Sequence, residues 1–324
     1  MIASRIETAQ MISFVDEEVR QLVIHACARI ENELVLSAPF LGELVCGWMS
    51  ALSPTGKAAD YFLQPGSFPL LYLPCWAARS FTVEPYAAFL SDVVYSTING
   101  YYYIRLLDNL MDNHATIELQ ILPATAFFHT EFQSTYQKYF EANHPFWDVF
   151  RSTWFAASDS VTHEARLNDV DQAQFEAVTV GKLLGARIPV AAVGFQYGIG
   201  ERSRYWEEFT LALARWSQIE DDLFDWHQDF YHGKTSHFLS QCRTRTEGVA
   251  TWVANEGFLH GMETLRRELE VLRRLARSLE SPDVIRYLDF LQADLEAQEI
   301  RIREAFLVAK DVARIIAPMS ISSL

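Results

Sequence analysis

The sequence predicts an all-α protein. Apolar residues recur at intervals of three and four along long segments, which is the spacing of one helix face. Alternation of apolar and polar residues between turn residues, the pattern of a half-buried strand, is hard to find. Hydrophobic residues make up 50% of the 324 residues and charged residues 21%, so a large core is expected. Because no Gly/Ser-rich linker or repeat divides the chain, we expect residues 1–324 to form a single domain.

Proline, glycine and capping residues set the expected element boundaries. Pro39 ends the first helix, and residues 53–69, rich in proline and glycine, are expected to be a loop. Pro85 fits the first turn of a long helix, Asn168 is a candidate N-cap, and Gly233 marks a helix exit. The expected helices are at residues 12–36, 40–52, 84–113, 118–141, 145–166, 168–197 and 203–231, with two or three more between 247 and 316.

Composition excludes several classes of function. The formal net charge of -15 argues against a nucleic-acid partner, which needs a basic surface. The four cysteines have no metal-binding or disulfide-like spacing, which is typical of free thiols in a reducing compartment. The N-terminus shows no secretory pattern, and the longest uncharged run, residues 61–78, is interrupted by prolines. We therefore expect a cytoplasmic protein without stable membrane insertion.

One segment, residues 218–229, concentrates carboxylates on a single helical stripe. At about 100° per residue, one amide and four carboxylates fall within roughly a third of the helix circumference. They belong to Gln218, Asp221, Asp222, Asp225 and Asp229. Carboxylates a few ångström apart repel, and against a core they require bound cations, for which Mg²⁺ suits an all-oxygen site. The alternative is a solvated acidic face, but such faces usually interleave Lys and Arg. Here the neighbours are largely aromatic, and the nearest basic residues are Arg215 and Lys234.

A second acidic pair, Asp108 and Asp112, lies near the end of the helix expected at residues 84–113. The same helical face continues back through Ile104, Tyr101 and Thr97, so an acidic rim would stand above an apolar, partly aromatic wall. An ordinary surface ion pair between Arg105 and Asp108 is the alternative for this pair alone. Two such helices together could enclose a pocket with metals at its mouth. Residues 180–194, which lie between the two motifs, contain only two cations, Lys182 and Arg187.

These motifs resemble those of a known family. Gln218-x-x-Asp221-Asp222-x-x-Asp225, followed by Gly233-Lys234, resembles the second aspartate-rich motif of the trans-isoprenyl diphosphate synthases. Asp108-Asn109-Leu110-Met111-Asp112 resembles a degraded first motif, with Asn109 in place of the second aspartate. Lys182 stands where that family has a Lys-Thr step. The first motif and the Asp225 to Asp229 spacing are also similar to the class IB terpene synthases, which cyclise a polyprenyl diphosphate. The resemblance covers about residues 85–239.

The resemblance implies an isoprenoid synthase-type helical bundle with a central cavity, using Mg²⁺, with three ions expected. Asp108 and Asp112 would bind metal from one wall, and Asp221, Asp225 and Asp229 from the other. Asp222 lies on the same arc and stays a metal candidate. The expected catalytic set is Asp108, Asp112, Asp221 and Asp225, and the expected diphosphate ligands are Lys182, Lys234 and Arg187. The expected cavity residues are Tyr101, Phe127, Phe128, Phe150, Trp154, Phe195 and Gln218.

Departures from the family pattern favour one reaction over another. Chain-elongating members bind a second diphosphate with basic motifs, but the corresponding stretches here are residues 55–59, Thr-Gly-Lys-Ala-Ala, and 113–116, Asn-His-Ala-Thr. We therefore expect a class I terpene synthase that ionises one linear allylic prenyl diphosphate and releases pyrophosphate. The alternatives are a prenyltransferase that transfers or couples a prenyl group, and a non-catalytic helical partner subunit. A homodimer is compatible with the resemblance.

Overall fold

The structure is a computed structural model that describes residues 16–64, 68–82, 84–111, 117–164, 166–179, 181–198, 200–242 and 248–319. Within these ranges every regular element is a helix, which confirms the expected all-α class. In chain order the elements are α1 (Glu17–Ser37), α2 (Pro39–Ala51), α3 (Ala58–Phe62), α4 (Tyr72–Phe81), α5 (Ala87–Met111), α6 (Glu118–Ile121), α7 (Ala124–Ser134), η1 (Thr135–Lys138), α8 (Phe146–Glu164), α9 (Gln172–Gln174), η2 (Phe175–Thr179), η3 (Gly181–Ala186), α10 (Arg187–Tyr197), α11 (Glu201–Phe224), α12 (Trp226–Tyr231), α13 (His237–Cys242), α14 (Val249–Trp252), η4 (Val253–Gly257), α15 (Phe258–Ala276) and α16 (Pro282–Met319).

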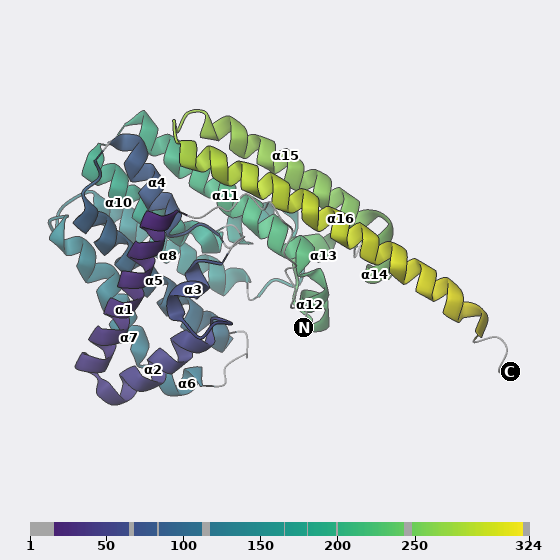
Figure 1. The fold of residues 1–324 in the computed structure, drawn as a ribbon, viewed down its shortest axis with the longest axis horizontal. Helices are drawn as coiled ribbons and strands as arrows, with labels where there is room; N and C mark the ends of the chain where they lie inside the picture. Colours follow the sequence, from purple (N-terminus) through teal and green to yellow (C-terminus); the bar gives the residue numbers. More distant parts are fainter. Residues whose placement is uncertain are drawn as a thin grey trace.

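The helices form two packed groups that share a core. Helices α11, α15 and α16 run side by side, while α1, α2, α5 and α7 pack together on the other side of the molecule (Figure 1). Helix α10 contacts α4 and α8, and it also contacts α5 of one group and α11 of the other. It thereby joins the two groups. Leu22, Tyr72 and Tyr103 pack against both buried clusters of apolar side chains, so the two clusters are continuous.

Helix α5 lies inside this arrangement, with α1, α4, α7, α10 and η1 packed around it. Most of its side chains from Phe89 to Gly100 are buried. Its buried polar side chains donate to nearby carbonyl oxygens: Ser96 Oγ to Phe132 O at 2.7 Å, Thr97 Oγ1 to Val93 O at 2.7 Å and Asn99 Nδ2 to Tyr95 O at 2.9 Å. These bonds remove most of the cost of burying polar groups in a helix that water does not reach.

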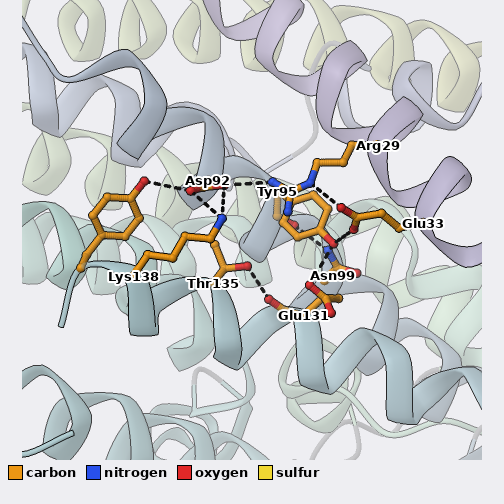
Figure 2. Close-up of polar contacts among 9 residues, drawn as sticks. Arg29, Glu33, Asp92, Tyr95, Asn99, Glu131, Thr135 and Lys138 are labelled. Carbon is orange, nitrogen blue, oxygen red and sulfur yellow. Dashed lines mark hydrogen bonds and ion pairs between the residues drawn. The ribbon is translucent and has the colours of Figure 1, made fainter. Parts of the chain in front are cut away.

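A charged network joins α5 to α1 and η1 (Figure 2). Asp92 accepts hydrogen bonds from Arg29 at 2.9 Å, Lys138 at 3.0 Å and Tyr139 at 2.8 Å. Arg29 also pairs with Glu33 at 2.8 Å, and its guanidinium lies 3.7 Å from the centre of the Tyr95 ring. Burial alone would raise the pKa of Asp92, but the three donors together lower it below its ordinary value.

Several element boundaries differ from the sequence-based expectation. Residues 53–69 are not loop throughout, because α3 lies within them. The helix expected at 118–141 is interrupted at Pro123, which has no N–H to donate, and gives α6, α7 and η1. Helices α4 and α13 were not expected. Residues 12–15 of the first expected helix lie outside the described part of the chain.

The segment expected as one helix from residue 168 to 197 changes its helical geometry three times. It begins at Asp171, not Asn168: the Asp171 side chain accepts from the Gln174 N–H at 2.8 Å and the Gln174 side chain bonds back to Asp171 N, which is a capping box. A π-helical turn, η2, and a 3₁₀ turn, η3, follow before α10 begins. Such irregular turns frequently mark functional positions.

In the described part of the chain, no single helix has the length and apolar character needed to cross a membrane. One bent pair, Gln172–Val178 with Leu183–Tyr197, meets the length and composition test jointly, with a 45° bend between its halves.

The Asp92 network should contribute to stability in a pH-dependent manner. The folded-state pKa of Asp92 is lowered, so its contribution is present above the ordinary value of 3.8 and is lost as the pH falls through the folded-state pKa. We expect Asp92→Asn to lower the free energy of unfolding at pH 7 by about 2 kcal/mol, since three charge-assisted bonds are weakened. Urea unfolding should show the difference from wild type narrowing below about pH 4. Asp148→Asn, at an exposed ion pair, is the control and should stay near wild type; equal effects of the two changes would contradict the network's role.

Candidate functional site

A cavity of about 340 Å³ lies between α3, α5, α7, α8, η3 and α10. Its walls are mostly apolar and aromatic, and none of the described residues that line it is charged. The lining residues are Tyr61, Phe62, Gln64, Phe68, Leu70, Leu71, Thr97, Gly100, Tyr101, Ile104, Phe132, Trp154, Leu183, Gly185, Ala186 and Pro189. Volume and lining are typical of a site for an apolar small molecule.

One face of α5 forms a wall of the cavity and leads toward the first acidic motif. Thr97, Tyr101 and Ile104 line the cavity and are spaced by four and three residues, so they share one side of the helix. The next position on this side is Asp108, whose side chain is 47% exposed. Arg105 lies 3.7 Å from the Asp108 carboxylate, which is a loose contact at an exposed position. Asp112 lies outside the described residues.

Two of the aromatic residues expected in the cavity line it, namely Tyr101 and Trp154. The other expected wall residues lie elsewhere in the core. Phe128 is fully buried against Tyr102 and Phe127, Phe150 packs on Phe132, and Phe195 packs on Phe140 and His144. Periodicity placed these rings in helices but could not tell which helix face meets the cavity.

The remaining walls come from residues that the motifs did not single out. Tyr61 and Phe62 of α3 form edge and tilted ring contacts with Tyr101, with Phe62 and Tyr101 centroids 5.2 Å apart. Phe132 packs against Gly100, where a Cβ atom would lie 2.9 Å from the ring. A glycine within the long expected helix was a signal of such a close approach. Burial, and next the neighbouring Tyr61, raise the pKa of Tyr101, so its phenol stays protonated near neutral pH.

Asp222 does not face the same way as the other carboxylates of the acidic stripe. It is 6% exposed, its Oδ1 accepts from Gln218 Nε2 at 2.8 Å, and its Oδ2 accepts from the backbone N–H of His237 at 3.1 Å. Asp222 therefore ties the end of α11 to the first residue of α13. Gln218 is buried in this contact and is not among the cavity residues.

The other acidic residues are distributed over the junction of two helices. Helix α11 ends at Phe224, and Asp225 adopts φ -100° and ψ 7° before α12 begins, so the expected continuous helix is broken there. Asp221 and Asp225 are exposed, and Asp225 accepts from Gln228 Nε2 at 3.1 Å. Asp229 is half-buried on α12 and its carbonyl accepts from the Lys234 N–H at 2.8 Å.

The turn after α12 brings Lys234 back beside Asp229. Gly233 has φ +68°, a left-handed conformation that glycine adopts without strain, and this fits the helix exit expected there. Lys234 itself is exposed. The backbone therefore holds one acidic and one basic residue of the expected site at the same turn.

The expected diphosphate ligands on η3 and α10 have different surroundings. Arg187, the first residue of α10, pairs with Glu207 of α11 at 2.5 Å. The backbone of Lys182 belongs to η3, but its side chain lies outside the described part of the structure. Because η3 lines the cavity and also packs on α11, it connects the cavity wall to the helix that bears the acidic stripe.

Asn109, which stands in place of an aspartate in the first motif, is held away from α5's cavity face. Its side-chain N–H donates to Glu118 Oε1 at 2.9 Å, and the Trp48 indole N–H donates to the same oxygen at 3.2 Å. The Ile117 N–H donates to the other Glu118 oxygen at 3.1 Å. Glu118, only 5% exposed, thus fastens the start of α6 to α5 and α2; sequence reasoning missed it because its partners are set by tertiary packing.

Mg²⁺ would be held by oxygen donors at the end of α11. In the described part of the chain, no group of three or more His, Cys, Asp or Glu side chains is arranged to hold a metal ion. Asp221 and Asp225 nevertheless fit the chemistry, because they are carboxylates four residues apart and exposed where they could accept a hard cation. Asp222 fits less well, because it is buried and its two oxygens accept hydrogen bonds from Gln218 and from the His237 N–H.

No protein-family model matches this sequence, and no curated protein matches it significantly.

Asp222 and Asp225 should differ in their effect on stability. Asp222→Ala removes the acceptor of a buried backbone N–H and of a buried amide, so we expect the free energy of unfolding to fall by about 2 kcal/mol. Asp225→Ala, at an exposed position, should change it little. Urea unfolding of both variants at pH 7 measures this. If Asp222→Ala left the free energy of unfolding unchanged, the proposed structural role of Asp222 would be wrong.

Proposed function

We propose that the protein is a Mg²⁺-dependent class I terpene synthase that ionises a linear allylic prenyl diphosphate and releases pyrophosphate. The observation that carries the proposal is the cavity face of α5, where an apolar and aromatic wall continues along one side of the helix to Asp108. A prenyl diphosphate is divided in the same way. Its apolar chain would lie in the cavity, and its charged diphosphate would require cations near Asp108. The motif resemblance at Asp108, Lys182 and Asp221 to Asp229 supports the same assignment.

Different residues of the chain would bind the charged end and the apolar end of the substrate. Bound Mg²⁺ would stabilise the negative charge that develops on the leaving diphosphate. Asp108, Asp221 and Asp225 would supply carboxylate oxygens for it, and Lys182 and Lys234 would hold the diphosphate. Arg187 is a weaker ligand in this scheme, because Glu207 already engages its guanidinium.

The cavity walls would then protect and steer the allylic cation. Aromatic faces stabilise a cation through the ring quadrupole, and Phe62, Tyr101 and Trp154 present rings to the cavity. Apolar side chains such as Leu183 and Pro189 have no lone pair that could attack the cation. An apolar wall also limits premature reaction with bulk water.

Cavity size favours a single prenyl chain over two reactants. A volume of about 340 Å³ lies near the lower end of the roughly 300–1,000 Å³ common for ligand sites. Coupling of two prenyl units, or transfer to a second apolar acceptor, would need more space. A product that contains an acceptor would instead identify a prenyltransferase, and the absence of pyrophosphate release from every prenyl diphosphate would favour a non-catalytic partner subunit.

Turnover should require the exposed carboxylates of the acidic stripe. Incubation with C10, C15, C20 and C25 prenyl diphosphates and Mg²⁺ should release pyrophosphate, and EDTA should abolish it. We expect Asp225→Ala to lower kcat at least about 100-fold, because a metal ligand at the developing charge is lost, while the melting temperature stays near wild type. Asp148→Asn, remote and exposed, is the matched control. Full activity of Asp225→Ala would remove that residue from the metal site.

Gly100 should control the length of chain that the cavity accepts. A Cβ atom there would lie 2.9 Å from the Phe132 ring, so Gly100→Ala must displace the ring and reshape this wall. We expect the preferred substrate to shift toward a shorter prenyl diphosphate, with kcat/KM for the longest accepted chain reduced about tenfold or more. Gly47→Ala, where a Cβ would meet nothing within 4 Å, is the control. An unchanged chain-length profile would show that this wall does not contact substrate.

A further inference from the structure

The cavity contains a small polar feature that the proposed ionisation does not use. Four of its lining side chains carry a hydroxyl or amide group: Tyr61, Gln64, Thr97 and Tyr101. Thr97 donates to the Val93 carbonyl at 2.7 Å, and Gln64 is exposed to solvent. The hydroxyls of Tyr61 and Tyr101 are hydrogen-bonded to each other across the cavity wall, between α3 and α5.

This hydroxyl pair, Tyr61 with Tyr101, has hydrogen-bonding capacity left over. Two phenol hydroxyls carry two protons, and the single bond between them uses only one. The second proton and the remaining lone pairs are the principal polar groups on an otherwise apolar surface. A hydroxyl on an apolar cavity wall gains free energy when it is paired, so a cavity ligand that supplies an oxygen atom here gains more than a pure hydrocarbon does.

The surroundings hold the pair in place. The rings of Tyr61, Phe62 and Tyr101 pack on one another with centroids 5.2 to 5.7 Å apart, and α3 is itself packed against α1 and α2. Burial raises the pKa of Tyr101, so its phenol remains an O–H group near neutral pH. The two hydroxyls are therefore held at a fixed position on the cavity wall.

We propose that the Tyr61–Tyr101 hydroxyl pair binds one oxygen atom inside the cavity, so that the cavity accepts an apolar chain together with a single hydroxyl group or water molecule. The neighbouring Tyr102 marks the contrast, because its hydroxyl is buried but it does not line the cavity. The pair thus differs from Tyr102 in its position on the cavity wall.

This inference deepens the proposed function and, for its chemical consequence, rests on it. Ionisation breaks the carbon–oxygen bond, and the diphosphate leaves with the electron pair. A water molecule held by the pair then forms a new carbon–oxygen bond to the cation through its lone pair. The resulting oxonium loses one proton to the released diphosphate, which leaves a neutral alcohol. The product is therefore an oxygenated terpenoid alcohol and not only a hydrocarbon.

A binding experiment tests the pair without any turnover. Geraniol and the C10 hydrocarbon myrcene are titrated into Mg²⁺-free protein, and tryptophan fluorescence is read, since Trp154 lines the cavity. The Tyr61→Phe/Tyr101→Phe double variant should bind geraniol about tenfold more weakly than wild type does, and myrcene within about twofold. Each probe is compared between wild type and variant, so the free energy of its transfer out of water is common to both measurements and cancels. Tyr102→Phe is the control and should match wild type for both probes.

Three results would overturn the proposal: no binding of either probe to wild type, geraniol affinity that survives the double substitution, or an equal loss for myrcene. A thermal melt of each variant confirms that it is folded.

A product experiment in ¹⁸O-labelled water tests the chemical consequence. Wild type should form a labelled alcohol, and in the double variant the ratio of alcohol to hydrocarbon product should fall. Exclusively hydrocarbon products from wild type would overturn water capture. If no pyrophosphate is released at all, the proposed function fails, while the geraniol and myrcene affinities still decide whether the pair binds oxygen.

Discussion

The burial of α5 is the constraint on which the rest of the structure depends. Neighbouring elements pack around this helix, so the polar side chains on its buried part cannot rely on water for hydrogen bonds. Ser96, Thr97 and Asn99 donate to carbonyl oxygens, and Asp92 is held by three donors from α1 and η1. With these groups engaged, α5 presents one apolar and aromatic face to the cavity. The same helix extends beyond the cavity to Asp108, so one element carries both the apolar wall and part of the first acidic motif.

The segment from η2 to α10 has a comparable role on the opposite wall. Its change from π to 3₁₀ to α geometry sets Gly181 against Ser160 of α8, where a Cβ atom would lie only 2.3 Å from the serine oxygen. A regular helix with a larger residue could not come so close to α8. Leu183, Gly185 and Ala186 consequently reach the cavity, and Lys182 is carried on the same short turn.

Local sequence rules predicted what depends on helical period and missed what depends on tertiary partners. The all-α class and the shared face of Thr97, Tyr101 and Ile104 follow from spacing alone. The division within the acidic stripe does not, because Asp222 is selected by the His237 N–H, fifteen residues farther along the chain. The break at Pro123 has a local cause, the missing proline N–H, whereas no proline marks the break at Asp225 or the π turn η2. Tyr61 and Phe62 reach the cavity only because a short helix forms where turn residues indicated loop.

The separation of Asp222 from Asp221 and Asp225 has an electrostatic consequence. Three carboxylates that faced one point would repel one another strongly. In a protein of net charge -15, few basic side chains are near enough to offset that repulsion. Turning Asp222 inward, where Gln218 and a backbone N–H solvate it, leaves two exposed carboxylates that water can solvate when no metal is bound. The acidic end of α11 therefore contains one carboxylate engaged in folding contacts and two carboxylates exposed to solvent. Substitution of each residue can therefore reveal its role separately, Asp222 through the stability of the fold and Asp225 through the activity that we propose.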